Sequence, residues 1–329
     1  MTVLVTGATG HVGANLVRAL VEQGHRVRAL VHSTGASLSG LDVEQARGDV
    51  TDAASLDAAM RGVEDVYHLA AVISILGDRG GELVRINVEG VRNVARAARR
   101  AGVRRLVHMS SCHAFDLDWG PGAIHEGAPR PKAGDPFYNR SKAMGEAALR
   151  AEIGLGLDAV IVNPTGVIGP YDFGPSRMGR FFLSLARGRL PSLIDGGFDF
   201  VDVRDLAATT IAAAARGRTG ENYLVGGRYV AVREIADVGA RCFGVTAPRV
   251  VAPMWLARGG APFMDAFGRV TGREPLYTSE SLHALRAGRI CSDRAKAELG
   301  HAPRPLETTV RDIYGWFEST GALSRRNAW

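Results

Sequence analysis

The side chains best suited to proton chemistry are Tyr138 and Lys142, the two ends of the run YNRSK. The chain holds three lysines and seven tyrosines among its 329 residues, so chance seldom produces this spacing. Residues i and i+4 of a helix share a face, and an ammonium group beside a phenol can lower its pKa from the usual value of about 10. A phenol tuned in this way is a usable proton donor. The spacing alone is equally compatible with a surface pair on an amphipathic helix.

Three glycines, Gly7, Gly10 and Gly13, recur at intervals of three in the run TGATGHVG. Glycine is common here, with 41 in the chain, so the spacing by itself is weak evidence. The position of the run is more informative, because it ends a predicted strand at residues 3–6 and opens a predicted helix at about 11–24. A glycine turn there lets a pyrophosphate approach the helix N-terminus closely. The run therefore predicts a nucleotide site.

The end of the second predicted strand, residues 26–31, bears on which dinucleotide binds. A dinucleotide fold usually has an acid at this point for the adenosine ribose. This strand is followed by His32 and Ser33, without a carboxylate. A 2′-phosphate would not be repelled, and Arg28, His32, Ser33 and Thr34 could contact it. These residues favour NADP over NAD, with an exposed histidine of no function as the alternative for His32.

A pair of hydroxyls, Ser110 and Ser111, follows the predicted strand at residues 105–110. Ligands of open α/β sheets bind outside this edge, where a serine can donate to a carbonyl oxygen as negative charge develops on it. A strand-end cap is the alternative interpretation. His113 is expected at most to line the pocket, and Cys112 to do no chemistry. A serine hydrolase is excluded because Ser111 lacks a nucleophile elbow.

Strand and helix patterns alternate through the first 160 residues, which is typical of βαβ units and a parallel sheet. We expect an α/β fold with a Rossmann-type doubly wound parallel sheet in residues 1–163 and a smaller, mainly substrate-binding region in residues 164–329, some of which returns to pack on the first domain. Further strands are predicted at 65–69, 105–110 and 159–163, and further helices at 82–101 and from Thr51 or Asp52 to about Gly62.

Composition narrows the class of protein. Hydrophobic residues make up 46% of the chain and charged residues 22%, without an apolar run of the roughly 18–20 residues that a membrane span needs. The net charge of +6 comes from arginines interleaved with acids, unlike the basic face of a nucleic-acid protein. The three cysteines are widely spaced and form no metal pattern. We expect a cytoplasmic protein that binds neither nucleic acid, membrane nor metal.

The order TGxxGxxG, GDV, HLAA, NVxG, SS and YxxxK resembles the extended short-chain dehydrogenase/reductase superfamily over nearly the whole chain. The closest likeness is to the dihydroflavonol-4-reductase-like and NAD-dependent epimerase/dehydratase group. The resemblance implies that Tyr138 donates or accepts the proton, that Lys142 holds the nicotinamide ribose and tunes Tyr138, and that Ser111, or failing that Ser110, polarises the substrate oxygen. Asn87 matches a family asparagine near the active-site helix, and a helix-capping role is the alternative.

The same resemblance implies the contacts to the dinucleotide. The glycine loop would hold the pyrophosphate, and Asp49 and Val50 would contact the adenine. Leu69, Ala70 and Ala71 would line the path of the dinucleotide. Cofactor contacts are therefore expected at Gly7, Gly10, His11, Val12, Gly13, His32, Asp49, Val50, Leu69, Ala70, Ala71, Tyr138, Lys142, Pro164, Thr165 and Val167. The family commonly forms homodimers through the helices at about 82–101 and 138–152.

One departure from the family separates the candidate functions. Nucleotide-sugar epimerases usually place a diphosphate-binding arginine where this chain has Phe198. That change removes a phosphate clamp and adds apolar surface, although Arg177 and Arg180 could supply charge from another side. The sequence thus favours an NAD(P)H-dependent reductase of ketones or aldehydes on an apolar, small-to-medium substrate. A sugar or nucleotide-sugar epimerase or dehydratase is the alternative, and a dinucleotide-sensing regulator is a third possibility.

Overall fold

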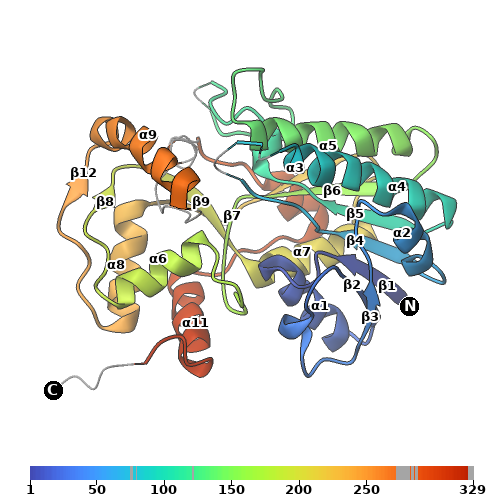
Figure 1. Ribbon diagram of the computed structural model, residues 1–329, viewed down its shortest axis with the longest axis horizontal. Helices are drawn as coiled ribbons and strands as arrows, with labels where there is room; N and C mark the ends of the chain where they lie inside the picture. Colours follow the sequence, from blue (N-terminus) through green and yellow to red (C-terminus); the bar gives the residue numbers. More distant parts are fainter. Residues whose placement is uncertain are drawn as a thin grey trace.

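The central element is a parallel sheet of seven strands in the order β10-β6-β5-β4-β1-β2-β3 (Figure 1). The structure is a computed structural model, and it describes residues 1–74, 77–78, 80–120, 122–271, 282, 285 and 288–324. The strands are β1 (Thr2–Thr6), β2 (Arg26–Val31), β3 (Val43–Arg47), β4 (Asp65–His68), β5 (Arg105–Met109), β6 (Ala159–Pro164) and β10 (Asn222–Val225). This order confirms the doubly wound Rossmann-type α/β fold.

Helices cover both faces of this sheet, so its central strands are buried; every residue of β4 and of β6 is buried. On one face pack α1 (His11–Glu22) and α7 (Val203–Arg216), and on the other α2 (Ala53–Ala59), α4 (Val91–Arg100) and α5 (Phe137–Ile153) (Figure 1). Leu16 and Leu206 belong to the first core, whereas Leu56 and Leu149 belong to the second.

The predicted helices are present with small differences. Asp52 caps α2, since its carboxylate accepts from the Ala54 amide at 3.0 Å. The helix expected at residues 82–101 is divided into α3 (Glu82–Val84), a π-helical segment (Arg85–Gly90) and α4. π-Helical turns are rare and frequently lie at functional sites. This one places Asn87 beneath α5.

The rest of the chain builds a second layer beside the carboxyl edge of the main sheet (Figure 1). It contains a three-stranded sheet ordered β11-β9-β7 and a two-stranded sheet of β12 and β8. The strands are β7 (Gly166–Ile168), β8 (Leu193–Ile194), β9 (Gly197–Asp202), β11 (Arg228–Ala231) and β12 (Val251–Ala252). The helices are α6 (Arg177–Ala186), α8 (Val232–Phe243), α9 (Met254–Thr271) and α11 (Leu306–Ser319), and short helical turns occur at Ala36–Leu38, Cys112–Ala114 and Ala295–Leu299.

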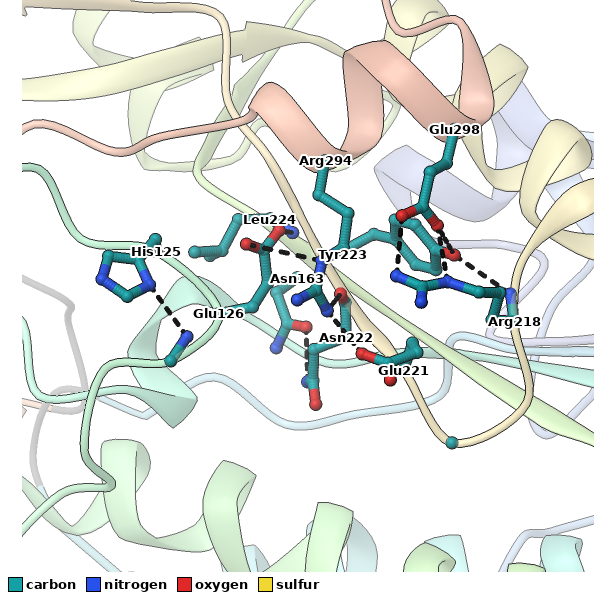
Figure 2. Close-up of polar contacts among 12 residues, drawn as sticks. His125, Glu126, Asn163, Arg218, Glu221, Asn222, Tyr223, Leu224, Arg294 and Glu298 are labelled. Atoms are coloured by element: carbon teal, nitrogen blue, oxygen red, sulfur yellow. Dashed lines mark hydrogen bonds and ion pairs between the residues drawn. The ribbon is translucent and has the colours of Figure 1, made fainter.

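Strand β10 joins the main sheet from a distant part of the sequence, and polar contacts with the C-terminal segment hold it (Figure 2). The Tyr223 hydroxyl donates to Glu298 at 2.6 Å. Arg294 forms an ion pair with Glu221 and donates to the Asn222 carbonyl at 3.2 Å. These contacts matter for the site, because β10 also places the Asn222 side chain beneath α5.

Candidate active site

Ser111, Tyr138 and Lys142 meet at the carboxyl end of β5. Ser111 lies two residues beyond that strand, and Tyr138 and Lys142 lie in the first two turns of α5. The Ser111 hydroxyl lies near enough to the Tyr138 phenol to lower the pKa of Tyr138, and the Lys142 Nζ atom donates to the Met109 carbonyl at 3.2 Å. The structure thus brings together the three residues that the sequence proposed as catalytic.

The position of α5, and with it of Tyr138 and Lys142, is set by close packing of this helix on the π-helical segment. A Cβ on Gly145 would lie 2.3 Å from the Asn87 carbonyl oxygen, so only glycine lets α5 approach this closely. The Asn87 side chain then bridges two elements. It donates to the Ser141 hydroxyl at 3.1 Å, and it exchanges two hydrogen bonds of 2.9 Å with the Val72 main chain. Asn87 therefore joins α5 to the segment after β4 and does not cap a helix.

The Tyr138 phenol is less acidic than the sequence suggested. Burial raises its pKa to about 12, because the phenolate would lose its solvation, and the nearby Ser111 hydroxyl only partly opposes this shift. The expectation that Lys142 lowers the pKa of Tyr138 below its usual value is wrong for this structure. The phenol consequently keeps its proton throughout the neutral range.

The Lys142 ammonium is nearly completely buried, with 4% of the residue exposed. Burial lowers its pKa to about 8, and the charge of Glu146 acts in the opposite direction. A lysine in this state still carries most of its positive charge at neutral pH. That charge can stabilise an anion on Tyr138 or on a substrate oxygen.

Glu146 organises the floor of the site and was missed in the sequence. It lies four residues beyond Lys142 on the same face of α5, and this spacing is the signal from which it could have been found. Its carboxylate accepts from the Ser110 hydroxyl at 2.6 Å, from the side chains of Asn163 at 2.7 Å and Asn222 at 3.0 Å, and pairs with Arg130 at 2.9 Å. Figure 2 shows Asn163 and Asn222 side by side, joined by a further hydrogen bond of 2.8 Å. Ser110 is thus engaged away from Tyr138, which leaves Ser111 as the candidate.

This difference between the two serines is testable. We expect Ser111→Ala to lower kcat about 100-fold with little change in stability, because it removes a donor to the developing negative charge. Ser110→Ala should instead lower the free energy of unfolding by about 1–3 kcal/mol, because it takes a donor from a buried carboxylate. Steady-state kinetics and urea unfolding of both variants measure the two effects. A larger loss of kcat in Ser110→Ala than in Ser111→Ala would reverse the assignment.

Two buried histidines lie below Lys142. His68 and His108 are cross-strand partners on β4 and β5, and their rings stack with centroids 5.2 Å apart. Burial lowers the pKa of both imidazoles, that of His68 to about 3, and the charge of Lys142 acts in the same direction. Both rings are therefore neutral, so they add no competing positive charge next to the lysine.

His113 forms part of the wall around Tyr138. Its ring contacts Tyr138 edge-on at 5.6 Å between centroids and stacks on Phe198 at 5.9 Å. The Nδ1 atom lies 3.0 Å from the Asn139 side-chain oxygen, an acceptor, so Nδ1 carries a proton. The neighbouring Cys112 is completely buried, and burial raises the pKa of its thiol to about 12. A thiol in that state is not a nucleophile.

The glycine loop has the shape that a dinucleotide pyrophosphate requires. Gly7 has a φ of +67°, and a Cβ there would lie 2.6 Å from the Ala70 amide nitrogen. A Cβ on Gly13 would lie 2.1 Å from the Gly7 carbonyl oxygen, so α1 can start this close to β1 only with glycine. The N-cap Gly10 makes no side-chain hydrogen bond to the first turn, which leaves the helix N-terminus open to phosphate. His11 and Val12 begin α1, and Leu69, Ala70 and Ala71 pass beside the loop.

At the predicted adenosine end, His32 follows β2, and its Nε2 atom lies 3.2 Å from the Asp49 carboxylate. Both side chains are accessible, at 76% and 38% exposure. A hydrogen bond from the Thr51 amide lowers the pKa of Asp49. Val50 is buried next to Gly90. Arg28 is engaged elsewhere, since it binds Glu44 at 2.7 Å and the Ala59 carbonyl at 2.8 Å, so its suggested contact with a 2′-phosphate is wrong.

At the predicted nicotinamide end, Pro164 ends β6 beside helix α5, Thr165 follows it, and Val167 lies in β7. Thr165 is buried, and its amide donates to the Val225 carbonyl of β10 at 3.1 Å. The predicted cofactor residues therefore line one edge of the sheet, from His32 at β2 to Val167 beyond β6.

Comparison with known proteins identifies the family. The model of the NAD dependent epimerase/dehydratase family matches residues 3–226. The chain belongs to this family. Like its relatives in this epimerase/dehydratase family, it is an NAD(P)-dependent oxidoreductase of the extended short-chain dehydrogenase/reductase type, acting on a small molecule with a nicotinamide dinucleotide.

Three similar proteins each align with nearly the whole of this chain. Sterol demethylase protein B of Methylococcus capsulatus is 40% identical over 98% of this chain and 100% of its own. A putative dihydroflavonol 4-reductase of a Synechocystis species is 32% identical, with 96% and 94% covered. The solved structure of a nucleoside-diphosphate-sugar epimerase from Pseudomonas aeruginosa is 25% identical, has a TM-score of 0.82, and aligns over 98% and 99% of the two chains.

The part of the chain that the structure describes offers neither a metal site nor a membrane span. No cluster of three or more histidine, cysteine, aspartate or glutamate side chains suited to a metal ion occurs there. Within the same residues, no helix combines the length and apolar character needed to cross a membrane.

Proposed function

We propose that the protein is a reductase that moves hydride between NADP(H), or less favourably NAD(H), and a ketone or aldehyde on an apolar substrate. The observation that carries this proposal is the pairing of the Ser111, Tyr138 and Lys142 cluster with an aromatic wall. Phe198 belongs to an apolar cluster with Phe115 and Leu117 and stacks on His113. A nucleotide-sugar enzyme of this family usually has a diphosphate-binding arginine in place of Phe198.

The bound nicotinamide would supply or accept the hydride. Gly7, Gly10 and Gly13 would hold its pyrophosphate, and the Lys142 ammonium would orient the ribose next to it. In the reducing direction Tyr138 donates its phenolic proton to the developing alkoxide, and the Ser111 hydroxyl donates a hydrogen bond to the same oxygen. Lys142 then stabilises the tyrosinate. A pKa of about 12 keeps Tyr138 protonated and so suits it to reduction.

The names of relatives support an apolar substrate. Sterol demethylase protein B is named for a sterol, and dihydroflavonol 4-reductase for a dihydroflavonol. Both are fused-ring compounds, and neither name includes a sugar. We extend this class of substrate to the present chain, with residues 164–329 forming most of the substrate side.

The preference for NADP rests on the missing carboxylate after β2 and on His32. We expect NADP⁺ to raise the melting temperature more than NAD⁺ does. His32→Ala should weaken NADP⁺ binding about tenfold and leave NAD⁺ binding unchanged, because only the 2′-phosphate accepts a charge-assisted hydrogen bond there. The matched control is His25→Ala, at the other end of β2. Equal affinity for the two dinucleotides in the parent protein would contradict the preference.

A redox-neutral epimerase or dehydratase of sugars is the second candidate, and the likeness to the Pseudomonas aeruginosa epimerase favours it. Cofactor consumption separates the two functions. A panel of apolar ketones and aldehydes, including a 3-ketosteroid, should oxidise one NADPH for each alcohol formed. UDP-sugars should be neither bound nor converted. Turnover of a UDP-sugar without net cofactor consumption would replace the reductase by the epimerase.

We also propose that α4 and α5 form a homodimer interface, as in related enzymes. Met144 is 44% exposed on α5, which leaves apolar surface on that helix for a second copy.

A further inference from the structure

Exposed large apolar side chains concentrate in one segment outside the catalytic site. They are Val250, Val251, Trp255, Leu256 and Phe263, and together they define the α9 face. Trp255 is 74% and Phe263 78% exposed, the highest values among large apolar residues in the described part of the chain. Isolated exposed apolar residues are ordinary, whereas a group of this kind marks an interaction surface.

The helix itself explains why these residues face solvent. Met254, Ala257 and Ala261 follow an i, i+3, i+7 spacing and pack inward against Ile194, Leu282 and Leu285. The opposite side carries Leu256 and Phe263, seven residues apart and therefore nearly in line, with Trp255 next to them. Helix α9 lies at the outer end of the molecule, beside β12 (Figure 1). Its outward side is thus apolar where a helix on the surface of a globular protein is ordinarily polar.

The charge of this segment identifies an occupant. Residues 244–271, up to the end of α9, contain three arginines, Arg249, Arg258 and Arg269, and one acid, Asp265. Arg249 and Arg258 are exposed, and neither forms an ion pair with another described residue. A neighbouring segment adds one more acid, Asp195, whose amide donates to the Ala252 carbonyl of β12. Arginines still outnumber acids around the α9 face. Tryptophan and arginine around an apolar stripe suit the headgroup region of an anionic bilayer.

We propose that the α9 face docks the protein on the surface of an anionic phospholipid membrane, with Trp255, Leu256 and Phe263 inserted among the headgroups and Arg249 and Arg258 facing lipid phosphates. The helix lies along the surface and does not cross it. The inference goes beyond the proposed reaction, since docking requires neither cofactor nor substrate. It also replaces the expectation from the sequence that the protein binds no membrane. A second copy of the chain covers the face less well, because it brings a further excess of arginine over acid from this segment.

Sedimentation of the full-length protein with vesicles tests the proposal without any assay of activity. Vesicles of phosphatidylcholine mixed with phosphatidylglycerol should bind the protein, salt should weaken the binding, and pure phosphatidylcholine should bind less. Trp255→Gln and Phe263→Gln should each weaken partitioning about tenfold, and Arg258→Gln about fivefold. Leu155→Gln, at a side chain 63% exposed elsewhere, and Arg311→Gln on α11 are the matched controls.

The tryptophan provides a second readout. Fluorescence emission should shift to the blue when anionic vesicles are added, and the shift should be lost in Trp255→Phe, which spares the other three tryptophans. Absence of binding to both kinds of vesicle overturns the proposal. So does a dimer that dissociates in Trp255→Gln, which would assign the face to a second copy. Reduction of a water-soluble carbonyl should be equal in all these variants, so failure of docking and failure of the proposed reaction are distinguishable.

Discussion

Replacing Tyr138 by phenylalanine should lower kcat for carbonyl reduction by about 100-fold to 10,000-fold while the protein still binds its dinucleotide. The loss is that expected for removal of a positioned general acid. Phenylalanine keeps the ring that packs edge-on against His113, so the wall of the site is preserved. Single-turnover measurement of cofactor oxidation, with dinucleotide affinity determined separately, isolates the chemical step.

The matched control for this variant is Tyr229→Phe on β11, a partly buried tyrosine of the second sheet. It loses a hydroxyl of the same kind and should keep the parent rate. If Tyr138→Phe binds cofactor normally and turns over at the parent rate, Tyr138 is not the proton donor and the proposed mechanism fails.

Replacing Lys142 by methionine should abolish most of the activity and yet stabilise the cofactor-free protein. At neutral pH the buried ammonium is charged, and a pKa lowered from 10.5 to about 8 corresponds to a cost of about 3 kcal/mol in the folded state. Methionine has a similar length and carries no charge. We expect a gain of about 1–3 kcal/mol in the free energy of unfolding, since part of the benefit is lost with the interaction between Lys142 and Glu146.

The pH dependence gives this prediction a definite sign. Between about pH 8 and pH 10.5 the unfolded chain keeps the proton on Lys142 while the folded chain releases it, so the parent protein should become more stable as pH rises. Tyr138 acts in the opposite sense from pH 10 to about 12, because its folded pKa is raised. Lys142→Met should lack the gain that begins near pH 8.

Urea unfolding at a series of pH values measures both effects. Lys296→Met replaces an exposed lysine paired with Asp293 and serves as the control, with little expected change. A Lys142→Met variant less stable than the parent at neutral pH would show that the buried charge is a net stabilising group.

Much of the fold was predictable because its determinants are local. The glycine loop, the apolar runs of β1, β2, β5 and β6 and the Asp52 cap all act within a few residues, and each is confirmed. Strands β3 and β10 were not predicted. The exposed pattern of β3 is that of an edge strand, and β10 has only four residues, whose place depends on distant Arg294 and Glu298.

In the candidate site, too, features set by nearby residues were predictable from the sequence, whereas features set by distant residues were not. The spacing of Tyr138 and Lys142 indicated that they share a face, and the strand end indicated Ser111. Spacing does not report burial, however, and burial decides the sign of the Tyr138 pKa shift. The separate tasks of Ser110 and Ser111 depend on Glu146 and Asn163, which approach from α5 and β6.

The most direct test of the central claim is the fate of the hydride. The protein should be incubated with a 3-ketosteroid or another apolar ketone and NADPH carrying deuterium at the transferable position, and the product analysed by mass spectrometry. We expect one deuterium on the new carbinol carbon, with one equivalent of NADP⁺ formed, and both products should form at least about 100-fold more slowly in Tyr138→Phe. A UDP-sugar isomerised with no deuterium gained from the added NADPH would contradict the claim.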